Sequence, residues 1–126
     1  MIIVPAVAVG PSGKRGRGIF ALKNFQPQEL IEVCPAIKFP NREWEDMAKT
    51  ILRQYAFSYD DDSSIIALGY GSLYNHSYNP NAFYQKGKSD NTLDIIAFKP
   101  ILRGQEIFIN YNADPYDQSP LWFDAL

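Results

Sequence analysis

Cysteine is almost absent from this chain of 126 residues, which contains only Cys34. A single cysteine excludes an internal disulfide, and with only one histidine there is no set of Cys and His ligands for a structural zinc ion. We therefore predict no metal site and an intracellular compartment. Val33 and Ala36 near Cys34 are typical of a strand, so we expect a buried and unreactive thiol.

Long apolar runs are also missing. No stretch approaches the roughly 20 apolar residues that a membrane-spanning helix needs, so we predict no membrane partner. The first ten residues, MIIVPAVAVG, lack a positively charged start and contain Pro5. This pattern favours an edge strand over a signal peptide.

Excess positive charge is the third feature that the sequence lacks. The formal net charge is −2, which argues against a protein that binds nucleic acid by bulk electrostatics. Lys14, Arg15 and Arg17 form one basic cluster, which is able to attract a carboxylate or a phosphate but is equally typical of a solvated turn. The aspartates at residues 60–62 predict an exposed loop, with the steering of a basic peptide as the functional alternative.

The length predicts a single domain over residues 1–126 with its own core. The fold class we predict is mainly β, with several sheets of short strands and one helix. Strands are expected at residues 3–9, 19–22, 30–39, 82–86, 92–97 and 106–111. We expect 82–86 and 92–97 to form a hairpin, with Ile95 and Ala97 facing one side of it.

The helix is predicted to begin at Asn41, a favourable N-cap residue, with Glu43 and Glu45 in its first turn. Its apolar residues recur at helical spacing: Trp44, Met47, Ala48, Ile51, Leu52 and Tyr55. This pattern predicts one amphipathic helix packed on a sheet.

Residues 68–82, LGYGSLYNHSYNPNA, place the only histidine in a run rich in asparagine, glycine and tyrosine. Short polar side chains such as Asn75 and Ser77 bond to nearby backbone and predict a compact loop. The flanking residues are apolar, which indicates that the loop lies at the ends of buried strands, where sites are common. On this stretch alone, a capped turn with a structural His76 is the simpler interpretation.

Three separated motifs resemble those of a SET domain in their order and spacing: GRGIFA at residues 16–21, YNHSYNPNA at 74–82 and GQEIFINY at 104–111. The resemblance covers essentially the whole chain and is closest to small free-standing viral and bacterial members. It implies a SET fold of the β-clip type, in which residues 75–77 and 107–111 cross as a pseudoknot. It also implies a protein-lysine methyltransferase that uses S-adenosylmethionine and acts on a lysine of a protein or peptide, with histones as one candidate class.

The resemblance also implies roles for individual residues. The expected cofactor contacts are Lys14, Gly16, Arg17, Gly18, Asn75, His76, Tyr111 and Trp122. Tyr111 is expected at the catalytic centre, and Tyr55 and Tyr116 in a channel for the lysine side chain. Packing at the helix end is an equal interpretation of Tyr55, and core burial an equal one of Trp122.

Tyrosines suit this reaction on physical grounds. A lysine amine has a solution pKa near 10.4, and burial beside a sulfonium lowers it, so no strong base is required. Aromatic rings form the sides of a narrow channel and attract cations, while their hydroxyls orient the amine. His76 would then contact the cofactor and support the structure, and would not act as a general base.

Two family positions differ, since Arg17 stands where an aromatic residue is common and Ser72 where arginine is common. The cysteine-rich segments that flank many SET domains are absent, so Tyr116, Trp122 and Phe123 are the candidates to complete the site. A symmetric homodimer is a second way to cover exposed aromatic side chains there. The resemblance places the protein in the cytoplasm of a prokaryote, or in the nucleus or on chromatin in a eukaryote or virus.

Two other functions stay open from the sequence. One is a degenerate SET fold that binds a peptide without turnover, which the intact Asn75, His76 and Tyr111 argue against. The other is a nucleic-acid-binding β-barrel, which the acidic balance argues against.

Overall fold

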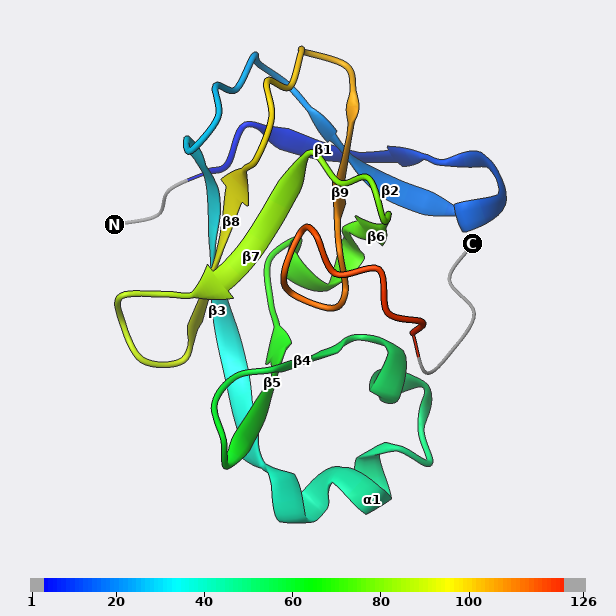
Figure 1. Cartoon of the computed structure of the whole chain (residues 1–126), viewed down its shortest axis with the longest axis vertical. Coiled ribbons are helices and arrows are strands. Elements are labelled where there is room, and N and C mark those ends of the chain that lie inside the picture. Colours follow the sequence, from blue (N-terminus) through cyan, green and yellow to red (C-terminus); the bar gives the residue numbers. More distant parts are fainter. Residues whose placement is uncertain (1–3, 122–126) are drawn as a thin grey trace.

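The computed structural model describes residues 4–121, which form two small sheets and one short α-helix. The strands are β1 (Val7–Pro11), β2 (Arg17–Ala21), β3 (Leu30–Pro40), β4 (Ala56–Ser58), β5 (Ser63–Ala67), β6 (Asn75–His76), β7 (Ala82–Lys86), β8 (Thr92–Ala97) and β9 (Glu106–Ile109). One sheet has the order β1-β2-β9-β6 and the other β4-β5-β3-β8-β7. In Figure 1 helix α1 (Trp44–Met47) lies at one end of the molecule and β1 and β2 at the other. The mainly β prediction is confirmed.

The hairpin of β7 and β8 has the predicted bounds and the predicted faces. The two strands pair antiparallel, with Ala82 opposite Ala97 and Lys86 opposite Leu93. Leu93, Ile95 and Ala97 are buried, while the residues between them are only half-buried. This regular alternation is the burial pattern expected of a strand with one face on the core.

The long strand β3 has apolar side chains on both of its faces. Leu30, Val33 and Ile37 are exposed, whereas Ile31, Glu32 and Cys34 are buried. Its pairing with β8 shifts register between Leu30 and Glu32, and such a bulge turns two consecutive side chains to the same face. Burial raises the pKa of the Cys34 thiol, and the charge of Glu32 adds to this effect, so the prediction of an unreactive buried cysteine is confirmed.

The predicted long amphipathic helix is wrong in length and in packing. Residues 41–55, here named the helical segment, consist of α1 between two 3₁₀ turns at Asn41–Glu43 and Ile51–Gln54. Thr50 interrupts the helix because its backbone is extended, while its hydroxyl donates to the carbonyl of Met47 and accepts from the N–H of Leu52. None of the three helical pieces has a buried residue, and Ile51 is 69% exposed.

Asn41 does not cap this segment as predicted. Pro40 precedes the first 3₁₀ turn, and no side chain accepts a capping hydrogen bond there. The Asn41 side chain instead accepts a hydrogen bond from the Ser64 hydroxyl at 2.8 Å. Asn41 therefore ties the start of the helical segment to β5.

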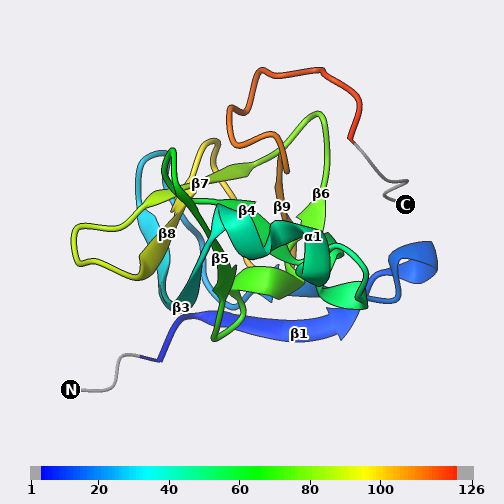
Figure 2. The ribbon, with the colours of Figure 1, turned by 90° about the horizontal axis from the view of Figure 1, so that it is seen from below.

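Strands β6 and β9 bring two distant parts of the chain side by side. They pair in parallel, with Asn75 opposite Phe108 and His76 opposite Ile109. The N–H of Ser77 extends the pairing by donating to the carbonyl of Ile109. Figure 2 shows the chain that follows β9 on the side of the molecule opposite β1. The threading of a pseudoknot stays a prediction, and β9 ends two residues before Tyr111 rather than at it.

Candidate active site

Tyr111 follows β9 and is held through three of its polar groups. Its N–H donates to Nδ1 of His76 at 3.0 Å, and its carbonyl accepts from the Tyr84 hydroxyl at 3.2 Å. Its own hydroxyl donates to the carbonyl of Tyr74 at 2.7 Å. Before it, the buried Asn110 side chain bonds the backbone of Asn112 and Asp117, which fixes the turn.

The hydrogen bond to Tyr74 sets the direction of the Tyr111 hydroxyl. Because its hydrogen points at the Tyr74 carbonyl, the oxygen presents its lone pairs elsewhere, as an acceptor. Burial raises the pKa of Tyr111 to about 12, and Tyr55 adds to the rise while Arg15 opposes it. Tyr111 is therefore a neutral phenol at physiological pH and not a base.

Tyr111 lies between a narrow pocket and a wider groove. The narrow pocket, of about 70 Å³, is lined by Gln54, Tyr55, Ala56, Phe57, Ser72, Tyr111, Asn112 and Leu121. The groove, of about 490 Å³, shares Ala56, Phe57, Tyr111 and Asn112 with it and is further lined by Asn41, Trp44, Ser58, Ser64, Tyr84 and Ala113. An extended side chain that enters from the groove would therefore pass the ring of Tyr111.

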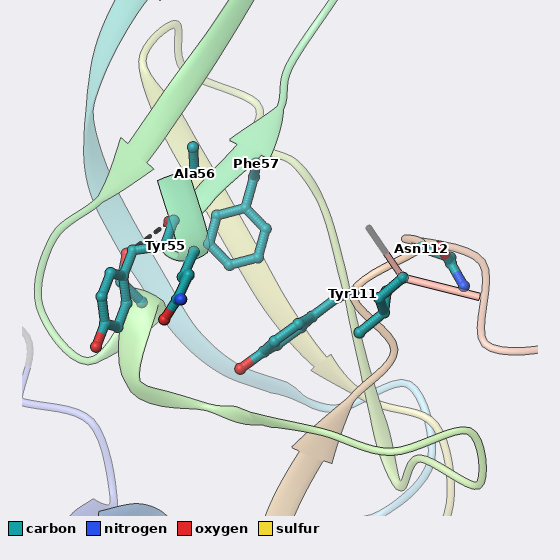
Figure 3. Close-up of a pocket in the computed structure, with 8 residues that line it drawn as sticks. Tyr55, Ala56, Phe57, Tyr111 and Asn112 are labelled. Carbon is teal, nitrogen blue, oxygen red and sulfur yellow. Dashed lines mark hydrogen bonds between the residues drawn. The ribbon is translucent and has the colours of Figure 1, made fainter. Parts of the chain in front are cut away.

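Tyr55 and Tyr111 line the same narrow pocket. Figure 3 shows the Tyr111 ring below Phe57, with its hydroxyl directed to the side on which Tyr55 lies. Tyr55 comes from the end of the helical segment, where its carbonyl accepts from the Ser72 hydroxyl. The pocket thus has three aromatic side chains, Tyr55 and Phe57 from one part of the chain and Tyr111 from another.

His76 is buried, and one of its ring nitrogens has no hydrogen-bond partner among residues 4–121. Nδ1 accepts the N–H of Tyr111, so the ring hydrogen must be on Nε2. Nε2 is buried, and within the described part of the chain it makes no hydrogen bond. Burial lowers the pKa of His76 and the charge of Arg15 lowers it further, so the ring is neutral at pH 7. A buried donor of this kind is commonly met by a ligand or water.

The Asn75 side chain binds other parts of the protein. Its amide nitrogen donates to the carbonyl of Arg17 at 3.0 Å and to the Glu106 carboxylate at 2.8 Å. The Ser12 hydroxyl donates to the same carboxylate, and a side chain at Gly18 would collide with it. Asn75 and Glu106 therefore hold the turn before β2 against β9, and a cofactor contact of Asn75 is left to its backbone and amide oxygen.

Arg15 belongs to the site although only its neighbours Lys14 and Arg17 were predicted as cofactor contacts. Its guanidinium lies over the ring of Phe108, 5.1 Å from the centroid. Its charge contributes to the lowered pKa of His76 and opposes the rise in the pKa of Tyr111. The basic cluster was visible in the sequence, but the partner ring on β9 that distinguishes Arg15 was not.

Tyr116 is not at the pocket of Tyr55 and Tyr111. It is 76% exposed and contacts Phe98 edge to face, 5.3 Å between ring centroids. After Tyr111 the backbone turns away, with Ala113 at φ 76° and the Asp114 carboxylate accepting from the N–H of Tyr116. The structure thus gives no support to its place in the channel. Trp122 and Phe123 lie outside the described residues.

Within residues 4–121 no three His, Cys, Asp or Glu side chains gather in a way that would hold a metal ion. No helix there has the length and apolar character that crossing a membrane requires.

The chain is similar to known proteins over most of its length. A family model described as the SET domain matches residues 16–112. A histone-lysine N-methyltransferase specific for H3 lysine-37 from Schizosaccharomyces pombe is 28% identical over 98% of this chain and 80% of its own length. One specific for H3 lysine-36 from Candida albicans is 35% identical over 81% of this chain, but the match spans only 13% of that protein. A crystal structure of a candidate histone methyltransferase from Plasmodium falciparum matches with a TM-score of 0.73 and 33% identity, covering 86% of this chain and 95% of that one.

Proposed function

The chain belongs to the SET domain family, and we propose that it transfers a methyl group from S-adenosylmethionine to a lysine side chain of a histone or another basic protein. One observation carries this proposal above the others. The Tyr111 hydroxyl is fixed as an acceptor beside a narrow aromatic pocket, next to a groove of about 490 Å³. That arrangement suits a long, apolar side chain that ends in an amine.

The residues present fit the cofactor. S-adenosylmethionine carries a carboxylate and several hydrogen-bond acceptors. The guanidinium of Arg15 beside β9 suits the carboxylate, and the buried Nε2–H of His76 suits an acceptor. Gly16 has φ 80° and open space around its Cα, so the backbone of this turn is accessible to a ligand.

Methyl transfer to a lysine amine requires no strong acid or base from the protein. When bound, S-adenosylmethionine would supply an electrophilic methyl group to a lysine amine that has already lost its proton to solvent, and the thioether would be the leaving group. The protein's part is to position the nitrogen and exclude water. Tyr111 presents its hydroxyl oxygen to the amine, Tyr55 lines the same pocket, and Phe57 and Ala56 form its apolar sides.

The relatives of the chain give the reason for proposing a histone, since they are named histone-lysine methyltransferases. A chromatin-associated location goes with that substrate. The charges of the helical segment beside the groove do not add to this argument, because its exposed acidic and basic residues are equal in number: Glu43, Glu45 and Asp46 against Arg42, Lys49 and Arg53.

A homodimer is part of the proposal. Tyr116 is exposed at the C-terminal end, and a second copy would cover it. Light scattering at concentrations that support activity is expected to give the mass of a dimer, and a monomer mass there would remove the dimer from the proposal.

The direct test combines transfer with binding. The purified chain is incubated with S-adenosylmethionine and a mixture of core histones, and mass spectrometry is expected to find new methyl-lysine. Calorimetric binding of S-adenosylmethionine without transfer to any histone would instead identify a degenerate binding module.

The cofactor site has its own test in Arg15. Arg15→Ala is expected to weaken calorimetric binding of S-adenosylmethionine roughly tenfold, because a charge-assisted contact to the carboxylate is lost. Arg42→Ala, on the exposed helical segment, is the matched control and should bind like the parent. If Arg15→Ala binds S-adenosylmethionine as tightly as the parent, Arg15 does not bind the carboxylate of the cofactor.

A further inference from the structure

Glu32 is a buried carboxylate that the site described above does not use. It lies on β3, is 7% exposed and is the only acidic side chain among the buried residues of the described chain. The bulge beside Ile31 is what turns it inward. Burying a carboxylate is costly unless hydrogen bonds compensate for the lost water, so its contacts need an explanation.

Both carboxylate oxygens of Glu32 accept hydrogen bonds from the segment that leads into β6. Oε1 accepts from the Tyr74 hydroxyl at 2.8 Å, and Oε2 accepts from the N–H of Tyr70 at 3.0 Å. Gly69 approaches so closely that a Cβ there would lie 2.6 Å from Oε2. One carboxylate thus holds both ends of residues 69–74.

Tyr74 connects Glu32 with Tyr111. It is 1% exposed, its hydroxyl is bound to Glu32, and its backbone carbonyl accepts from the Tyr111 hydroxyl at 2.7 Å. Because the ring is enclosed and its hydroxyl is tied, the carbonyl has little freedom to move. The direction of the Tyr111 hydroxyl therefore depends on a carboxylate two hydrogen bonds away.

We propose that Glu32 is a positioning residue for methyl transfer, which acts on the Tyr111 hydroxyl through Tyr74. The proposal rests on the proposed function, since it concerns the same reaction. Glu32 itself touches neither substrate nor cofactor. Its task is to keep the Tyr74 carbonyl where it fixes the lone pairs of Tyr111 towards the amine.

Glu32→Gln is the first test. An amide has one acceptor oxygen where the carboxylate has two, so either Tyr70 or Tyr74 loses its acceptor. Single-turnover methyl transfer is expected to fall roughly tenfold, since small displacements of positioning groups are costly, while calorimetric affinity for S-adenosylmethionine stays within about twofold. Glu29→Gln, which weakens the ion pair with Lys23 and can keep the bond to the Gln26 N–H, is the control and should keep parental rates.

A double-mutant cycle separates positioning from general loss of structure. In a Tyr111→Phe background there is no hydroxyl to position, so Glu32→Gln is expected to change the residual rate by less than about twofold. The same tenfold fall in both backgrounds would overturn the proposal. If Glu32→Gln does not fold, Tyr74→Phe takes its place, because it removes the hydroxyl bound to Glu32 and keeps the carbonyl.

A spectroscopic measurement keeps the proposal testable if no transfer is found. In protein labelled with ¹³Cζ-tyrosine, the resonance that disappears in Tyr111→Phe belongs to Tyr111. Glu32→Gln is expected to shift this resonance, because the Tyr74 carbonyl that accepts from the Tyr111 hydroxyl is no longer held in place. Glu29→Gln is expected to leave it unchanged. If the parent protein transfers no methyl group but Glu32→Gln shifts the Tyr111 resonance, only the proposed function is refuted. If Glu32→Gln leaves the resonance unchanged, only the positioning role is refuted.

Discussion

Two regions meet at the pocket around Tyr111, and they are built in opposite ways. The crossing, here residues 74–76 and 107–111, contains the buried Tyr74, His76 and Asn110 and is linked by hydrogen bonds between its two parts. The helical segment, residues 41–55, has no buried residue in its helical pieces. Its interruption at Thr50 is stabilised only by neighbours in sequence.

This difference indicates a division of tasks. A group that must hold an atom in place needs a side chain locked by packing and further hydrogen bonds, and Tyr111 on the crossing has both. An exposed segment with few buried contacts opens at low cost in free energy and can adjust to a substrate. We therefore expect changes in the crossing to affect turnover and stability, and changes in the helical segment to affect substrate binding.

Tyr111→Phe should show the largest effect. The ring remains and only the hydroxyl is lost, so the packing of the pocket is kept. Single-turnover methyl transfer is expected to fall roughly a hundredfold, the size typical of losing one preorganised polar group at a reacting centre. Affinity for S-adenosylmethionine, measured beside it by calorimetry, should change little.

Two results would contradict this assignment. Near-parental turnover would make Tyr111 a structural residue only. A fall in cofactor affinity as large as the fall in rate would make it a cofactor contact instead. Tyr84→Phe is a matched control for stability, because it removes the hydroxyl that donates to the carbonyl of Tyr111 and leaves the Tyr111 hydroxyl untouched.

Asn75→Ala should rank second, as a loss of stability in the crossing. It leaves the Arg17 carbonyl and one oxygen of Glu106 without their donor. Such a loss costs about 1–3 kcal/mol when the groups are partly buried. Urea unfolding should show this decrease, and cofactor binding should weaken as well because the turn at Gly16 is released. If Asn75→Ala has the stability of the parent and also its affinity for S-adenosylmethionine, Asn75 has no role in the site.

Sequence predicted the parts of this molecule in which local pattern and tertiary packing agree. The β7–β8 hairpin is one case, since its alternation is regular and its partner strand is adjacent in the chain. The motif around Asn75 and His76 is another, because it indicated where polar groups would be crowded. Both predictions depended only on residues close together in sequence.

Sequence failed where a single local event overrides the pattern. On β3 a bulge turns Ile31 and Glu32 to the same face, so that Glu32 is buried while the neighbouring Val33 is exposed. At Thr50 a hydroxyl competes with the helix backbone and ends a helix whose apolar spacing was regular. Arg15 was not identified as a site residue because its partner Phe108 is 93 positions away, on a strand that only the folded chain brings near.

The pH dependence of the free energy of unfolding is the third prediction for the crossing, and its effect should be smaller than those of Tyr111→Phe and Asn75→Ala. His76 is the only histidine, and burial lowers its pKa below the usual value of about 6.5. The folded state then binds this proton less tightly than the unfolded state. The stability that the neutral ring contributes is full above about pH 6.5 and is lost as the pH falls through the lower folded value, with a slope of at most about 1.4 kcal/mol per pH unit.

Urea unfolding between pH 7.5 and 5 measures this contribution. His76→Asn is the comparison, because an amide oxygen near the position of Nδ1 can still accept the N–H of Tyr111 and does not titrate. The parent should lose stability over this range while the variant keeps a nearly constant value. Equal slopes in the two proteins would show that His76 does not change its protonation on unfolding.

Trp44→Ala should have the smallest effect and the most specific one. Trp44 lines the groove from the helical segment and stacks on Phe39, with 6.4 Å between ring centroids, while it stays half-buried. Loss of this ring removes apolar surface from the groove but leaves Tyr111 and the crossing unchanged. We expect KM for a basic peptide to rise roughly fivefold, as for a partly exposed apolar contact, with kcat at saturating peptide close to the parental value. A fall in kcat with an unchanged KM would show that the helical segment positions the reacting groups, and the division between the two regions would then be wrong.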